Sequence, residues 1–139
     1  MAKKVATIDI VEIDAETIEK DDSFPTAYAF YIKLSGRPER QWVDIFNFEW
    51  KRSLYLMKTE ISVVGDKLRL ISGAEDNIQN HIAFARDLVR KTNERVEEDN
   101  RRIELMEKRK RGAGDEIERE KEEIRRKLKG ISLEQKTKG

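Results

Sequence analysis

Asp44 is the acidic residue with the most unusual surroundings in the sequence. The aromatic residues at even spacing around it are Trp42, Phe46, Phe48 and Trp50. Alternate residues of a strand share one face, so a strand here would place the carboxyl group among aromatic rings. Desolvation in such a place raises a carboxyl pKa, as a general acid requires. A small enzyme with Asp44 in an aromatic cleft is therefore one hypothesis, and an ion pair with Arg40 or Arg52 is the simpler interpretation.

Other residues that commonly take part in catalysis are scarce. His81 is the single histidine, and its helical spacing to Phe84 and Leu88 indicates packing at the edge of a buried face. The chain has no cysteine, which excludes disulfides, thiol nucleophiles and thiolate metal sites. The acidic residues near the N-terminus match no calcium-loop spacing, and the glycines form no phosphate-binding loop. The sequence therefore predicts no catalytic residue, no cofactor and no metal site.

A basic run offers a second chemistry. Its members are Lys108, Arg109, Lys110 and Arg111. Together with sheet aromatics such as Trp42 they could bind nucleic acid or a phosphate ligand. The same run also fits the end of a helix, where cations complement the macrodipole. With 29 basic and 28 acidic residues the chain has no general attraction for polyanions, so nucleic-acid binding is the weaker alternative.

The C-terminal half carries an apolar row at heptad spacing. Read every seventh residue, it runs Ile82, Val89, Val96, Ile103, Lys110, Ile117, Ile124, Ile131. Such a row is typical of a helix that packs on another helix. The residues predicted to form a partner-binding seam are Val96, Ile103, Met106, Ile117, Ile124 and Leu128. They predict a non-enzymatic protein–protein interaction or assembly module that binds a helical partner or forms a homo-oligomer, with a dimer favoured.

The segment Gly112–Gly114 interrupts this helical half. Lys108–Arg111 before it fit a helix end, and Asp115 after it fits an N-cap. We therefore expect an arm over 93–130 that is broken here and folds back as a helix-turn-helix hairpin. The alternative is a continuous helix that pairs with a second chain. The second seam row weakens a long parallel pair of this kind, because it reads Ala85, Thr92, Asp99, Met106, Ala113, Glu120, Lys127.

These sites need a folded body, which the sequence places in residues 1–92. All aromatic residues lie between Phe24 and Phe84. Alternating patterns predict strands at about 5–13, 26–35, 41–50, 53–64 and 67–72. In the first strand, alternation breaks at Ile10-Val11, which indicates a bulge or burial of both faces. Gly65-Asp66 fits a type II′ turn between the last two strands.

The body also includes the start of a long helix. Ser72 and Glu75 fit a capping box for a helix from residue 74, and the broad apolar face that follows narrows after Thr92. The expected fold is α+β, with an antiparallel sheet of about five strands, a meander with hairpins, packed by the first part of this helix. A charged helical arm and a flexible tail over 131–139 follow. We expect a cytoplasmic location, since no signal-peptide-like or membrane-spanning stretch is apparent.

Overall fold

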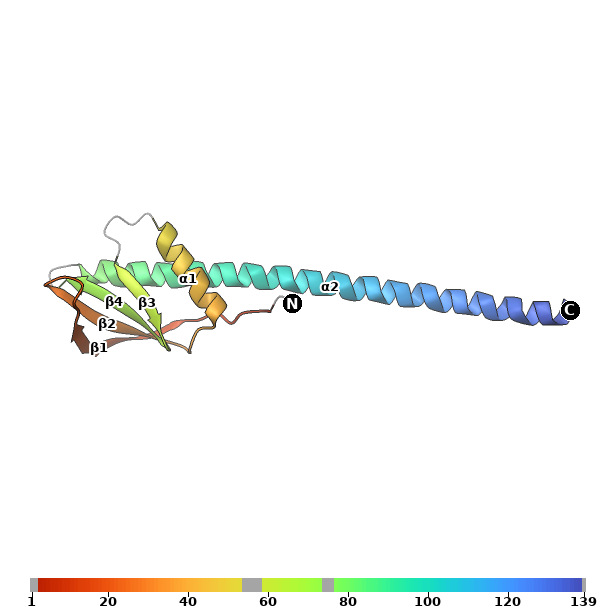
Figure 1. The fold of residues 1–139 in the computed structure, drawn as a ribbon, viewed down its shortest axis with the longest axis horizontal. Coiled ribbons are helices and arrows are strands. Elements are labelled where there is room, and N and C mark those ends of the chain that lie inside the picture. The colour runs from red at the N-terminus through yellow and green to blue at the C-terminus, as the bar shows by residue number, and fades with distance from the viewer. Residues whose placement is uncertain (1–2, 54–58, 74–76, 139) are drawn as a thin grey trace. The chain divides into compact units, whose positions relative to one another are not determined.

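Over the residues that the structure describes, the protein is an α+β structure with one antiparallel sheet and two helices (Figure 1). The computed structural model describes residues 3–53, 59–73 and 77–138, with side chains described through residue 131. The strands are β1 (Ile10–Lys20), β2 (Ala27–Leu34), β3 (Glu60–Val64) and β4 (Lys67–Gly73), and the helices are α1 (Arg40–Arg52) and α2 (Ile78–Lys138). The sheet order is β1-β2-β4-β3, so β1 and β3 are its two edges.

The hairpin of β3 and β4 confirms the sequence prediction in detail. Val64 pairs with Lys67, and Gly65 between the strands has φ 61°, as the first turn residue of a type II′ turn requires. Leu68 and Leu70 are fully buried, as the predicted inward face demands. Residues 54–58 of the predicted strand 53–64 lie outside the described residues.

Strand β1 begins later than the sequence predicts. Residues 5–9 precede it, and a register shift between Ile10 and Glu12 confirms the bulge interpretation of the broken alternation. Ahead of the strand, side chains of α2 hydrogen-bond the backbone at Val5 and Ile8. Asn93 Oδ1 accepts from the Ile8 amide at 3.0 Å, and Asn100 Oδ1 accepts from the Val5 amide at 2.9 Å.

The predicted strand 41–50 is wrong, because this segment forms helix α1. Four strands instead of five are therefore present in the described part of the chain. The buried residues of α1 are Trp42, Phe46 and Glu49, which are spaced four and three apart and therefore share one helical face. Trp42 and Phe46 stack with ring centroids 5.4 Å apart. An aromatic residue at every fourth position satisfies strand and helix periods alike, which explains the error.

One core joins both helices to a single face of the sheet. From the sheet it contains Ile32, Leu34, Leu68 and Leu70; from α1 and α2 it contains Trp42, Phe46, Phe84, Ala85, Leu88, Val89 and Val96. Helix α2 begins at Ile78, and its cap is Asn77, whose Oδ1 accepts from the Asn80 amide at 3.2 Å. Ser72 therefore is not the cap, and it belongs to β4.

Helix α2 runs without a break through Gly112 and Gly114, so the predicted hairpin in 93–130 is wrong. Among the described residues only Gly65 has positive φ, which means that Gly112 does not take the left-handed conformation that ends helices. Two helical glycines cost about 1 kcal/mol each, and strong helix formers on both sides outweigh that cost. The helix also continues to Lys138, where the sequence predicts a flexible tail.

The chain divides into two units, Met1–Asn100 and Arg101–Gly139, with α2 contributing to both. The sequence places this boundary after residue 92, which is too early. Val96 is 1% exposed and belongs to the core, and Asn100 binds the backbone of Val5. The contact at Asn100 is made by the N-terminal segment, and a local sequence pattern does not predict that this segment lies beside α2.

Candidate functional site

The aromatic cleft expected around Asp44 does not exist. Asp44 is exposed on α1, while Trp42 is fully buried in the core. Residues two apart on a helix lie about 200° apart around its axis, so the two side chains point to different sides. Trp42 Nε1 donates to Asn93 Oδ1 at 2.9 Å, so the indole supports packing and presents no face to a ligand.

Among the described residues of the body, a buried histidine and serine form the one pairing that resembles catalytic chemistry. His81 is 6% exposed and Ser72 is 3% exposed, and His81 Nδ1 lies 2.9 Å from Ser72 Oγ. Ser72 Oγ donates to the carbonyl of its neighbour Gly73. Within the described part of the chain, no carboxylate is bonded to His81. The pair therefore lacks the acidic residue that orients the histidine in a catalytic triad. This contact fastens the start of α2 to β4, as expected for a packing histidine.

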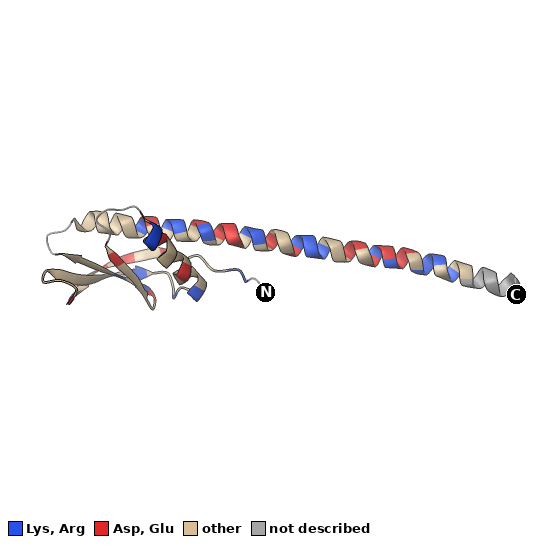
Figure 2. Ribbon diagram, turned by 45° about the horizontal axis from the view of Figure 1, so that its top comes forward, with Lys and Arg blue, Asp and Glu red and all other residues tan. Residues whose placement is uncertain are grey.

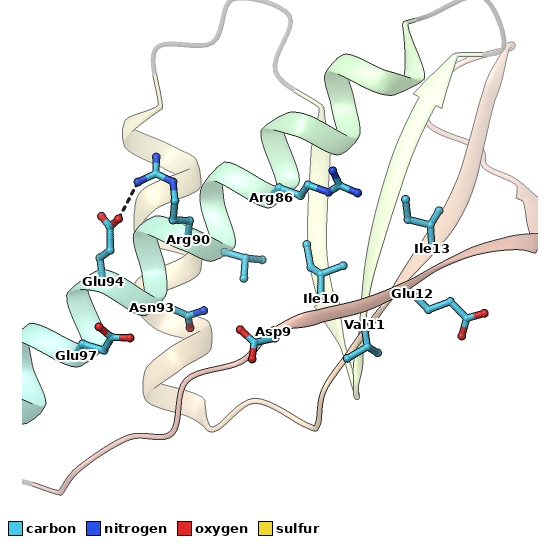
Figure 3. A pocket seen from close by; sticks show the side chains of 11 residues that line it. Asp9, Ile10, Val11, Glu12, Ile13, Arg86, Arg90, Asn93, Glu94 and Glu97 are labelled. Carbon is cyan, nitrogen blue, oxygen red and sulfur yellow. Dashed lines mark hydrogen bonds and ion pairs between the residues drawn. The ribbon is translucent and has the colours of Figure 1, made fainter.

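A polar groove of about 650 Å³ lies between β1 and α2 (Figure 3). Its walls are residues 9–13 on one side and Arg86, Val89, Arg90, Asn93, Glu94 and Glu97 on the other. No residue of β2 or β4 lines it, so the groove opens at the free edge of β1. Charges of both signs are present, and the groove therefore selects no simple anion or cation.

Arg90, in the wall of this groove, is already paired within α2. Its guanidinium bonds Asp87 and lies 2.8 Å from Glu94 Oε1, as Figure 3 shows for Glu94. These carboxylates, Asp87 first, raise the pKa of Arg90 above its ordinary value. Partial burial raises the pKa of Asp87, but hydrogen bonds from Arg90 and Lys91 outweigh it and the net pKa is lowered. The ion pairs stiffen the helix surface.

A second, apolar pocket of about 380 Å³ lies where β1 and β2 meet the first turns of α2. Its aliphatic and aromatic lining residues are Ile13, Ile18, Tyr28, Phe30, Ile78 and Ile82. Ile18 is 62% exposed and Ile78 is 44% exposed, so the pocket is open to solvent.

The predicted seam residues divide between the two units. Val96 is in the core of the first unit, and Ile103 is half-buried. The others are exposed on α2: Met106 by 63%, Ile117 by 52%, Ile124 by 54% and Leu128 by 57%. We call Ile103, Met106, Ile117, Ile124 and Leu128 the apolar seam.

Charged residues surround the apolar seam on α2, where Figure 2 shows both signs interspersed along the helix. Glu118 pairs with Lys121, Glu122 with Arg125 and Glu123 with Lys127, all three or four residues apart. The predicted nucleic-acid contacts Lys108, Arg109, Lys110 and Arg111 are exposed on the same helix. Trp42, expected among the sheet aromatics that would accompany them, lies on α1 and is buried. Tyr28 of β2 is 39% exposed, and Lys20 Nζ lies 4.9 Å from its ring centroid. The exposed ring of Phe48 already has the Arg52 and Arg95 guanidinium groups within 5.7 Å and 5.3 Å of its centroid.

The sequence interpretation missed three structural contacts of the body. Asn93 and Asn100 hold the N-terminal segment, and Asp21 pairs with Arg69 at 2.7 Å. The available signal was the seven-residue spacing of the two asparagines, which places them on one side of a helix.

The described residues contain no group of three or more acidic, histidine or cysteine side chains that could hold a metal ion. Nor does either described helix combine the length and apolar character that a bilayer-spanning segment needs. The chain matches no protein-family model, no curated protein and no solved structure.

Proposed function

We propose that the protein is a non-enzymatic interaction module that binds an α-helical partner through the apolar seam of α2. The observation that carries this proposal is the exposure of Met106, Ile117, Ile124 and Leu128, each more than half accessible on one charged helix. A single exposed aliphatic residue is ordinary on a protein surface. Large aliphatic side chains repeated at heptad spacing are typical of a helix that buries them against another helix.

The arrangement of charge supports the same function. Glu, Lys and Arg residues occupy the rest of the helix surface and form i,i+3 and i,i+4 ion pairs. These pairs keep the helix formed while its seam is unoccupied. A preformed helix loses little conformational entropy on binding, which favours association through a narrow contact.

Enzymatic alternatives receive less support from the geometry. Asp44 is exposed away from the aromatic residues, and His81 and Ser72 are both buried. Neither set combines an accessible nucleophile with an oriented base. The proposed function therefore assigns the folded body a supporting role and the seam the binding role.

Light scattering of the purified protein tests the proposal, with Ile117→Asp and Ile124→Asp as seam variants. A charged side chain in an apolar helix contact costs several kcal/mol, so each variant should weaken association at least tenfold. Leu105→Asp is the matched control, since Leu105 is also 55% exposed on α2 but lies opposite the seam. If the wild-type chain is monomeric, no partner co-purifies and the seam variants change nothing, the proposal is wrong.

A further inference from the structure

The direction in which the seam can pair follows from its two rows of residues. The stronger row is Ile103, Lys110, Ile117 and Ile124, and the weaker row is Met106, Ala113, Glu120 and Lys127. In a coiled coil these are the a and d positions, which meet across the interface in layers. Parallel chains place each residue against its own copy, whereas antiparallel chains place one row against the other.

We infer that the partner of the seam is a second copy of this chain, bound antiparallel with residues 110 and 120 opposite each other. This inference rests on the proposed function, because it names the partner of the same seam. The layers that result pair Ile103 with Lys127, Met106 with Ile124, Lys110 with Glu120 and Ala113 with Ile117, each occurring twice by symmetry.

Parallel pairing in register creates three layers of like charge. Lys110, Glu120 and Lys127 would each face the same residue of the second copy. Like charges in a desolvated layer cost several kcal/mol. Antiparallel pairing removes all three conflicts, because Lys110 then faces Glu120 and the aliphatic stem of Lys127 covers Ile103. Within the described part of the chain, Arg109, Lys110 and Glu120 form no ion pair, so these charges are free for a second copy.

The neighbouring antiparallel registers place the charged seam residues less favourably. A shift of one heptad in one direction puts Ile103 against Glu120 and Ile124 against Asp99. A shift the other way puts Lys110 against Lys127. Within the paired segment, only the intermediate register avoids both a layer of like charges and a carboxylate that faces an isoleucine. Flanking charges, such as Glu107 and Lys121, can form ion pairs in parallel and in antiparallel pairs. The residues in the layers therefore determine the direction and the register.

The inferred register also fits the division of the chain. Its symmetry centre lies at residue 115, so Arg101 of one copy stands opposite residue 129 of the other. The paired segment therefore lies within the unit Arg101–Gly139 and requires no buried residue of the first unit. It spans about four heptads, which is long enough for a specific helix pair. Near the centre, Ala113 of the weaker row and the adjacent Gly114 are small, which lets the two helices approach closely; a Cβ at Gly114 would meet nothing within 4 Å in the chain itself.

Cysteine cross-linking of the full chain tests the direction, because the natural chain has no cysteine. Met106→Cys and Ile124→Cys are made separately, mixed, and oxidised. In the inferred dimer, each position lies roughly 27 Å from its own copy at the standard helical rise, beyond reach of a disulfide. The mixture should therefore give a cross-linked dimer, while each variant alone should not. Leu105→Cys mixed with Ile124→Cys is the control and should not cross-link.

Each result separates this inference from the proposed function. A cross-link in Met106→Cys alone indicates parallel chains and overturns the inference, while association through the seam stands. A monomeric wild-type chain that recovers a different helical protein overturns it in the same way. A monomer with no partner, unaffected by Ile117→Asp, overturns both.

A charge exchange checks the register without a covalent bond. Lys110→Glu should weaken the dimer about tenfold or more, since it faces Glu120 with a like charge in two symmetric layers. Adding Glu120→Lys should restore association to near the wild-type level. In a parallel pair the single variant only exchanges one like-charge layer for another, so an unchanged dissociation constant would contradict the inferred register.

Discussion

At the scale of single residues, the body depends on two side-chain amides of α2 that hydrogen-bond the backbone ahead of β1. Asn93 accepts hydrogen bonds from the Ile8 amide and from Trp42 Nε1, and its own amide donates to the Ile8 carbonyl at 2.6 Å. Asn100 repeats the two backbone bonds at Val5. Seven helical residues and three extended residues both span roughly 10 Å, so the two asparagines match the two backbone positions.

Asn93→Ala should therefore destabilise the body strongly. It leaves the Trp42 indole and the Ile8 backbone without partners, at about 1–3 kcal/mol for each buried group. We expect a loss of about 3 kcal/mol in the free energy of unfolding, measured by urea denaturation. Glu94→Ala, at the exposed neighbouring position, should change it by less than about 1 kcal/mol. Equal effects of the two variants would argue against the bridging role of Asn93.

Asp21 gives the body a defined dependence on acid. Hydrogen bonds from Ser23, and then the ion pair with Arg69, lower the pKa of Asp21 from 3.8 to about 2. The unfolded chain then binds the proton more tightly, so this contribution is complete above about pH 4 and is lost as the pH falls toward 2. Asp21→Asn should remove that part of the pH dependence of unfolding. The neighbouring exposed Asp22→Asn is the control, and an unchanged acid transition in Asp21→Asn would contradict the assignment.

At the scale of elements, the continuity of α2 depends on the backbone conformation of Gly112 and Gly114. Their helical conformation leaves open space where a Cβ would stand, whereas Gly65 holds φ +61° in the β3–β4 turn. At Gly112–Gly114 the local sequence carries signals for the end of one helix and for the start of another. Such signals alone do not show whether a break or a continuous helix is more stable. Helix formers on both sides favour continuation here.

Replacing both Gly112 and Gly114 with Ala should raise the helix content and stability of the arm. The expected gain is about 0.5–1 kcal/mol for each position, seen as a higher midpoint in thermal melts followed by far-ultraviolet circular dichroism. Gly65→Ala is the contrasting control and should destabilise the hairpin by about 1 kcal/mol or more, because its positive φ disfavours a side chain. Lower helicity in the double variant would indicate a turn.

At the scale of the whole molecule, the proposed function assigns the two units separate tasks. The core cluster lies entirely within the first unit, from Val5 to Val96. The exposed row from Met106 onward lies in the second. A chain ending after Asn100 should therefore fold by itself.

That truncation is a direct test of this division. Residues 1–100 should unfold in one cooperative transition and remain monomeric in light scattering under conditions where the full chain associates. Removing residues 132–139 alone is the milder control and should leave association intact, because it spares the seam. Association by the 1–100 chain would place the binding surface in the body.

The sequence by itself determined the features that depend on local periodicity and turn chemistry. The β3–β4 hairpin, the buried face of α2 and the heptad row are readable because each has one consistent period or turn residue. Tertiary structure decided what local patterns leave open. The segment 40–52 became a helix because this conformation buries Trp42 and Phe46 together in the core. The backbone at Ile8 and Val5 is held by Asn93 and Asn100, which lie 85 and 95 residues further along the chain, and no local pattern carries information over such a distance.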